Sequence, residues 1–231
     1  MKTRLVPPLT ATEAAALSEC LLRDTSACML AAVRHEEADL IAAFSPVESR
    51  EEFQVLLPGV FHLLPQRGES LGERLFNAAQ EALTQGYESV CLIGSDSPGL
   101  PPEFLVTAIT TLKPPGDRIV LGPADDGGYY LMGLKSAHRR VFEDIEWSTG
   151  QVLAQTIDRA TELGVEVRLL QRWYDLDDEC DLKRACRELL SPGGVAVDFT
   201  ERAAGHTRDY LAGLIKDRTG WLTTSFEPDE K

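Results

Sequence analysis

The chain has 231 residues, 43% of them hydrophobic and 26% charged, which is typical of a globular protein with a sizeable core. Its 37 acidic residues against 23 Lys and Arg give a formal net charge of −14, which argues against binding of nucleic acid or anionic lipid. No run approaches the ~18 apolar residues of a membrane span, and "MKTRLVPPLT" lacks a signal-peptide stretch. The five scattered cysteines form no Cys-x-x-Cys pair, so reduced thiols in the cytoplasm are expected. The sequence leaves the oligomeric state open.

Helical and strand patterns alternate along the chain. Capping boxes at Thr10–Glu13 and Ser70–Glu73 predict helices that end near Val33 and Gln85. Further helices are predicted at residues 101–112, 149–163 and 177–190. Segments of strand length lie between the helices, at residues 39–44, 60–65, 89–94, 118–122, 129–134 and 165–170. This alternation predicts an α/β fold with a mostly parallel sheet.

The break "SPGG" at residues 191–194 divides the chain into a body and a tail. Residues 1–190 carry all the predicted strands and are expected to form one domain. The tail, residues 191–231, contains a helical stretch from about Glu201 to Lys216. It is too short to fold alone, so we expect it to pack on the same domain.

The stretch "GPADDGGYYLMGL", Gly122–Leu134, places two acids and two glycines between two apolar runs. One interpretation is a hairpin, with Asp125 and Asp126 forming the turn and Gly127 and Gly128 supplying positive φ. The other is a site, because glycines admit a ligand close to the backbone and carboxylates can accept a proton or hold a cation.

Acidic residues also follow two other predicted strands. Asp96 comes directly after the apolar run 89–94, whose pattern is that of a strand buried on both faces. Ligands of open α/β sheets bind at this edge, although a turn or N-cap aspartate is an equally good interpretation. Asp175 and Asp177 alternate, so both can face one side, and Asp177 or Asp178 could instead cap the last helix. Oxygen ligands without a nearby histidine favour Mg²⁺ or Mn²⁺.

Two further motifs precede helices. In "QRGESLGERL", Gly68 and Gly72 flank a helix start and Arg74 lies in its first turns, which could receive an anion; a capped surface helix is the plainer interpretation. In "EWSTG", Trp147 is expected to be a core or lid aromatic, or to stack on a substrate ring, while Ser148 or Thr149 caps the next helix.

Taken together, the motifs resemble one family. "KTRL" at residues 2–5, "QRGESLGERL", "LIGSDSPGLP", "LGPADDGGYYLMGL", "EWST" and "YDLDDECDL" occur in this order. They resemble a bacterial group of GT-A-like transferases, known as glycosyltransferases or radical-SAM/selenodomain-associated transferases. That group is similar to the guanylyl- and cytidylyltransferases of molybdopterin and phospholactate metabolism. The resemblance covers roughly residues 2–190 and implies a three-layer α/β/α nucleotide-diphospho-sugar transferase fold.

The resemblance also implies roles for individual residues. A divalent metal, Mg²⁺ or Mn²⁺, would be held by Asp96, Asp175 and Asp177. Asp125 or Asp126 would act as the general base, with Gly127, Gly128 and Trp147 binding substrate. The residues expected to bind the nucleotide are Lys2, Arg4, Gln66, Gly68, Arg74 and Ser95. The expected small-molecule partner is a nucleotide or a nucleotide sugar.

The family has an apolar strand and a Pro/Gly loop before "KTRL", whereas this sequence begins at Met1. Either the true start lies upstream or the sheet lacks that first strand. Because a Gly-rich first loop that would cradle a triphosphate is missing, we favour a glycosyltransferase. A nucleotidyltransferase of the guanylyl or cytidylyl type and a non-catalytic nucleotide-binding module are the alternatives.

Overall fold

The structure is a computed structural model that describes residues 3–190 and 204–217. Lys2 and much of the predicted tail therefore lie outside the described residues. The chain divides into two compact units. The sheet unit comprises Cys28–Gly94 and Pro102–Tyr174, and the helical unit comprises the described parts of residues 1–27, 95–101 and 175–231.

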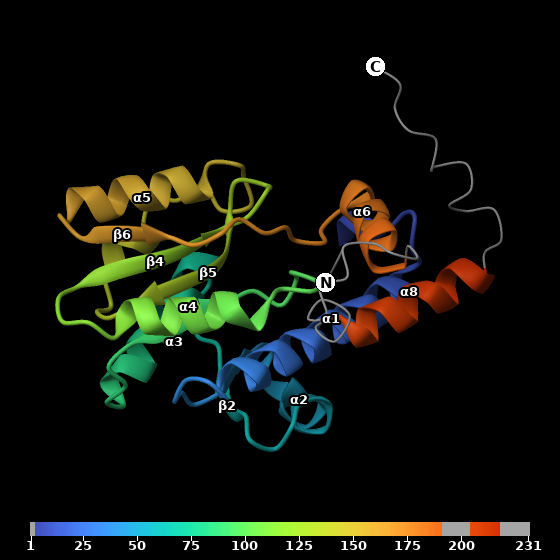
Figure 1. Ribbon diagram of the computed structural model, residues 1–231, viewed down its shortest axis with the longest axis horizontal. Helices are drawn as coiled ribbons and strands as arrows, with labels where there is room; N and C mark the ends of the chain where they lie inside the picture. Colours follow the sequence, from blue (N-terminus) through green and yellow to red (C-terminus); the bar gives the residue numbers. More distant parts are fainter. Residues whose placement is uncertain (1–2, 191–203, 218–231) are drawn as a thin grey trace. The chain divides into compact units, whose positions relative to one another are not determined.

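The sheet unit contains two separate sheets (Figure 1). The smaller pairs β1 (Ile41–Phe44) with β2 (His62–Pro65) in parallel. The larger has the order β3-β5-β4-β6. Its strands are β3 (Val90–Ile93), β4 (Arg118–Pro123), β5 (Tyr129–Leu134) and β6 (Glu166–Leu169).

The expectation of a mostly parallel sheet is wrong. In the larger sheet only β4 and β6 are parallel, and β5 is antiparallel to both β3 and β4. The reason is the length of the β4–β5 connection, because five residues can close a hairpin but cannot make the crossover that parallel strands need. The fold is therefore mixed α/β with small, mixed sheets.

Helices cover both faces of the larger sheet. One face packs its apolar side chains against α3 (Leu71–Thr84), η3 (Arg139–Phe142) and α5 (Val152–Glu162). The other face receives α4 (Pro102–Leu112), which approaches so closely that a Cβ on Gly133 would lie 2.9 Å from Leu112 Cδ1. Figure 1 shows α4 and α5 on opposite sides of the strands.

Within the described residues, β1 and β3 each pair with another strand on one edge only. The segments just before them are linked, since the Tyr87 hydroxyl donates to Asp39 Oδ2 at 2.7 Å. All four side chains of β3 are only partly buried, so the expectation that this strand is covered on both faces is wrong. A strand at the edge of a sheet has neighbours on one side only, which accounts for the exposure.

The helical unit is built from α1 (Ala11–Ala32, whose last five residues belong to the sheet unit), α6 (Glu179–Leu190) and α8 (Gly205–Asp217). Leu17 and Leu21 of α1 share a buried cluster with Leu182 of α6 and Leu211 of α8. The predicted capping box before α1 is confirmed, because the Thr10 hydroxyl accepts from Glu13 N–H and the Glu13 carboxylate accepts from Thr10 N–H.

Some short elements were not predicted. They are η1 (Thr3–Leu5), η2 (Val47–Ser49) and α2 (Arg50–Leu56), of which α2 has no buried residue and so no apolar stripe to reveal it. Among the helices in the described part of the chain, none combines the length and apolarity needed to span a membrane.

Candidate functional site

The stretch 122–134 forms the predicted hairpin. β4 and β5 pair antiparallel across the loop 124–128, and Ala124 N–H donates to Gly128 O at 3.0 Å. Gly127 has φ +87°, the left-handed conformation that glycine tolerates best. Gly128 does not have positive φ, so the expectation that both glycines supply it is wrong for Gly128.

The loop is held against the residues that precede α5. Gly127 O accepts a hydrogen bond from Leu153 N–H at 2.9 Å. A Cβ on Gly127 would lie 2.2 Å from Gly150 O, closer than real Cβ atoms come to any other atom. Glycine at position 127 is therefore required by its backbone conformation and by this contact.

Both aspartates of the loop are exposed. Asp126 Oδ1 accepts from Gly128 N–H at 2.8 Å, so this carboxylate shapes the turn that contains it. Because Ile93 at the end of β3 and Gly122 near the end of β4 both pair with Leu131, the loop lies at the edge where these two strands end. That edge is the usual ligand position in α/β sheets.

A groove of about 410 Å³ lies in the same unit, between the start of α3 and the segment 139–147. We call it the aromatic groove. Trp147 lines it and is partly exposed, with its ring edge-on to Tyr129 at 6.4 Å between centroids. A Cβ on Gly72 would lie 2.8 Å from Trp147 Nε1, so Trp147 lies on α3 where the helix has no side chain. Its other lining residues are Ser70, Glu73, Phe76, Arg139, Phe142, Glu143, Asp144 and Ile145.

The start of α3 carries its own carboxylate. Glu73 and Ser70 form the predicted capping box, and Glu73 Oε2 also accepts from Glu69 N–H at 2.8 Å. These backbone hydrogen bonds lower the pKa of Glu73. Arg74 Nε donates to Gly68 O at 3.0 Å, and Gln66 Nε2 donates to Ala43 O at 3.2 Å. Nucleotide binding by Gln66, Gly68 and Arg74 stays a prediction.

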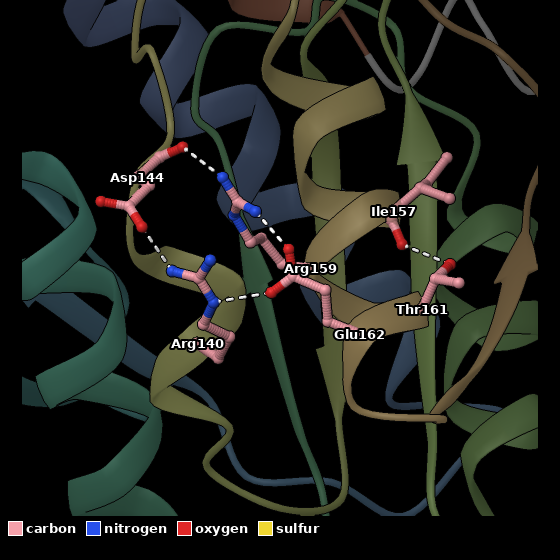
Figure 2. A network of polar contacts seen from close by, with 6 residues as sticks. All are labelled: Arg140, Asp144, Ile157, Arg159, Thr161 and Glu162. Carbon is pink, nitrogen blue, oxygen red and sulfur yellow. Dashed lines mark hydrogen bonds and ion pairs between the residues drawn. The ribbon is translucent and has the colours of Figure 1, made fainter.

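An ion network holds the segment that forms one wall of the aromatic groove (Figure 2). Arg140 donates to Asp144 at 2.5 Å and to Glu162 of α5 at 2.8 Å, and Glu162 also pairs with Arg159. Arg140 lowers the pKa of Asp144 and, together with Arg159, that of Glu162. Asp144 and Ser148 adopt positive φ, so the segment follows a conformation that tertiary contacts must maintain.

The predicted metal ligands all lie in the helical unit. Leu176 N–H donates to Asp96 O at 2.8 Å and the Ser97 hydroxyl donates to Asp175 at 2.5 Å, so the segments 95–97 and 175–177 lie side by side. Arg4 donates to Asp177 at 2.7 Å, and the Ser95 hydroxyl lies 3.4 Å from Asp96 Oδ1. That these acids also meet Asp125 and Asp126 stays a prediction.

The acids after this segment cap a helix. Asp178 Oδ1 accepts from Cys180 and Asp181 N–H, and Asp181 accepts in return from Asp177 and Asp178 N–H. The N-cap interpretation is thus confirmed for Asp178. Burial is the largest influence on the pKa of Asp181, which it raises.

The acids of the helical unit suit a hard cation only in a limited way. Within residues 3–190 and 204–217, no three His, Cys, Asp or Glu side chains are placed to hold a metal ion together. Mg²⁺, however, commonly uses one or two carboxylates with water and substrate phosphates. That Asp96, Asp175 and Asp177 hold a divalent metal stays a prediction.

Sequence patterns missed Arg139, Phe142, Glu143 and Gly150. Arg139, Phe142 and Glu143 line the groove from a segment without periodicity, and only the glycine directly after "EWST" indicated the close contact with Gly127. Trp147 lines the groove, and its binding of substrate stays a prediction.

Comparisons with known proteins bear on the whole chain. A model of a bacterial family described as "Uncharacterized protein conserved in bacteria (DUF2064)" matches residues 28–149. The chain is also similar to a solved structure, a "putative nucleotide-diphospho-sugar transferase" from Desulfovibrio desulfuricans G20, with 30% identity, 91% of each chain covered and a TM-score of 0.72. A search of curated proteins found no match. The mixed α/β fold resembles that of the Desulfovibrio protein.

Proposed function

The chain belongs to the DUF2064 family, and on that premise we propose that it transfers a sugar from a nucleotide-diphospho-sugar donor to an acceptor hydroxyl group. The observation that carries the proposal is the similarity to the Desulfovibrio protein, which extends over 91% of both chains. The hairpin loop supports it, because it presents an exposed carboxylate at the edge where β3 and β4 end.

In the proposed reaction, the acceptor oxygen forms a bond to the anomeric carbon of the donor sugar. The bond from that carbon to the diphosphate oxygen breaks, and the nucleoside diphosphate leaves with the electron pair. The acceptor proton passes to the general base, for which Asp125 and Asp126, both exposed on the hairpin loop, are the candidates.

A divalent cation would belong to the donor side of this reaction. Mg²⁺ or Mn²⁺ neutralises charge that develops on a departing diphosphate. Asp96, with Asp175 or Asp177, would hold it together with donor phosphate oxygens, and Arg4 would face the same phosphates. Since Arg4 now pairs with Asp177, binding of donor would exchange that ion pair for new ones.

Product analysis tests the proposal. The protein is incubated with nucleotide sugars and Mg²⁺, and separately with nucleoside triphosphates and sugar phosphates. Release of nucleoside diphosphate from the first set is expected. If pyrophosphate is released from the second set and no nucleoside diphosphate from the first, the reaction is nucleotidyl transfer and the glycosyl-transfer proposal is wrong. Binding without any turnover would support a non-catalytic module.

Asp96→Asn tests the metal assignment. Wild-type protein is expected to gain about 2.7 kcal/mol of stability at a ligand concentration 100 times the dissociation constant, and only when Mg²⁺ is present. Asparagine keeps the size and hydrogen bonding of Asp96 but removes the charge, so the variant should keep its melting temperature and lose the Mg²⁺-dependent gain. An undiminished gain would exclude Asp96 as a ligand.

A further inference from the structure

We propose that the aromatic groove binds the acceptor of the transfer, and that this acceptor is a neutral or cationic compound with an apolar face and is not phosphorylated. The inference rests on the proposed function and names the substrate class for one side of it. Three features of the groove support it: an apolar floor, an acidic rim, and a shared turn with the hairpin loop.

The floor of the groove is apolar and buried. Phe76 of α3 and Phe142 of η3 are 3% and 6% exposed and pack edge to face at 5.9 Å between centroids. Gly72 and Ile145 complete the floor, and the partly exposed Trp147 forms a wall. A groove with aromatic walls favours a ligand that has a flat or apolar face, such as an aromatic ring or one side of a sugar ring.

The rim of the groove is acidic. Glu73, Glu143 and Asp144 line it against one arginine, Arg139. The Arg139 guanidinium lies over the Phe76 ring, 4.1 Å from its centroid, and Asp144 is paired with Arg140. Backbone hydrogen bonds lower the pKa of Glu73 and so favour its charged form. Glu73 and Glu143 together therefore disfavour a phosphate and favour hydroxyl or ammonium groups.

The start of a helix would normally attract an anion, but here a carboxylate already lies there. Ser70 Oγ accepts from Glu73 N–H at 3.2 Å, and Glu73 Oε2 accepts from Glu69 and Ser70 N–H. Three backbone donors around the start of α3 thus already have an acceptor. The negative charge of Glu73 at this position disfavours a phosphate.

The groove and the proposed base share one turn of the chain. Trp147 lines the groove, and three residues later Gly150 makes the close contact with Gly127 in the loop that carries Asp125. The ion network of Arg140, Asp144, Glu162 and Arg159 holds the preceding segment on α5 (Figure 2). A groove fixed in this way loses little freedom when a ligand binds, which favours affinity.

Three probes with a common phenyl ring test the charge preference: tyramine is cationic, phenyl β-D-glucoside is neutral and phenyl phosphate is anionic. Saturation-transfer NMR and titration measure their binding to the full chain. We expect tyramine and the glucoside to bind and phenyl phosphate to bind at least about fivefold more weakly than tyramine. Equal or tighter binding of phenyl phosphate would overturn the proposal.

Two substitutions assign the binding to the groove. Glu143→Gln should weaken the binding of tyramine by roughly fivefold, leave the affinity for the glucoside unchanged and strengthen the binding of phenyl phosphate. Asp158→Asn, which removes the same charge from an exposed position of α5 outside the groove, should change none of the three. Trp147→Ala should weaken the binding of the glucoside by about tenfold or more, provided that the variant protein still melts cooperatively. Identical effects of Glu143→Gln and Asp158→Asn would contradict the assignment.

Donor binding, measured on the same samples, separates this inference from the proposed function. If the probes bind as expected but no nucleotide sugar binds or reacts, the transferase proposal fails and the groove remains a site for neutral or cationic ligands. If nucleotide sugars react while Glu143→Gln leaves all probes unchanged, the transferase proposal stands and the acceptor site lies elsewhere.

Discussion

Aspartates gather in both units, but they differ in exposure. In the helical unit, the partly buried Asp178 and Asp181 cap α6, and Asp24, which is 3% exposed, accepts from His206 and Thr207 N–H at the start of α8. In the sheet unit, Asp126 shapes the hairpin loop, and both Asp125 and Asp126 are exposed.

This difference shows that the role of an aspartate after a strand or before a helix cannot be assigned from its position in the sequence alone. A carboxylate that receives backbone N–H groups stabilises a helix start or a turn. One that is exposed on a fixed loop can meet a substrate. Substitutions should therefore divide into those that reduce the reaction rate in the sheet unit and those that reduce stability in the helical unit.

The sharpest test compares Asp125→Asn with Asp126→Asn. We expect the substitution that removes the general base to lower kcat by on the order of 10² to 10⁴, and the other to retain most activity. Asp126→Asn should keep the turn, since the asparagine Oδ1 can still accept from Gly128 N–H, so a large loss of rate there would identify Asp126 as the base. Rates of sugar transfer and melting curves measure both effects. Small effects of both substitutions on kcat would contradict a base in this loop.

Gly127→Ala should have the largest effect on stability. We expect a loss of about 2–6 kcal/mol, because left-handed strain and overpacking each cost about 1–3 kcal/mol. Gly86→Ala is the matched control, with φ +103° but nothing within 4 Å of the added Cβ. Denaturant unfolding should show a smaller loss for Gly86→Ala. Equal losses of stability would mean that the backbone at Gly150 moves readily to make room for the added Cβ.

Asp24→Ala tests the helical unit. One buried and one partly buried backbone donor at the start of α8 would lose their acceptor, which we expect to destabilise the protein by about 1–3 kcal/mol. Hydrogen exchange should rise first in residues 205–217. Asp209→Ala, an exposed acid on the same helix, is the control and should have little effect. Unchanged protection of α8 in Asp24→Ala would show that the apolar cluster alone holds it.

Arg140→Gln is expected to have the smallest effect, and one that depends on pH. The folded-state pKa values of Asp144 and Glu162 are lowered from 3.8 and 4.5, so their pairing stabilises the protein above these values. This contribution disappears as the pH falls through the lowered pKa values. The melting temperatures of wild type and variant should differ at pH 7 and converge in acid. Arg168→Gln, from an exposed pair with Glu166, is the control. If the melting temperatures still differ in acid, Arg140 stabilises the protein through packing and not through its charge.

Local signals predicted much of the secondary structure. The Thr10 and Ser70 capping boxes and the hairpin at 124–128 depend on residues a few positions apart, so their chemistry is visible in the sequence. Strand direction was not visible in this way, because the alternation of elements suggested crossovers although the short β4–β5 connection allows only a hairpin.

The candidate site was predictable only in part. Trp147 and the loop aspartates stood out by motif. The groove around Trp147 did not, because it joins α3 to a segment about 70 residues later in the chain. Arg140 and Glu162 are 22 residues apart, and no periodic pattern connects them. Contacts of this kind depend on tertiary packing.

In the part of the chain that the structure describes, β1 and β3 each have one edge without a pairing strand, and this affects how the protein behaves in concentrated solution. Their sequences, Ile-Ala-Ala-Phe and Val-Cys-Leu-Ile, contain no charge and no proline, the two devices that usually stop another chain from adding a strand. The net charge of −14 keeps molecules apart at low salt, but screening shortens its reach to about 8 Å at physiological ionic strength. Salt and crowding should therefore favour edge-to-edge association through these four-residue segments.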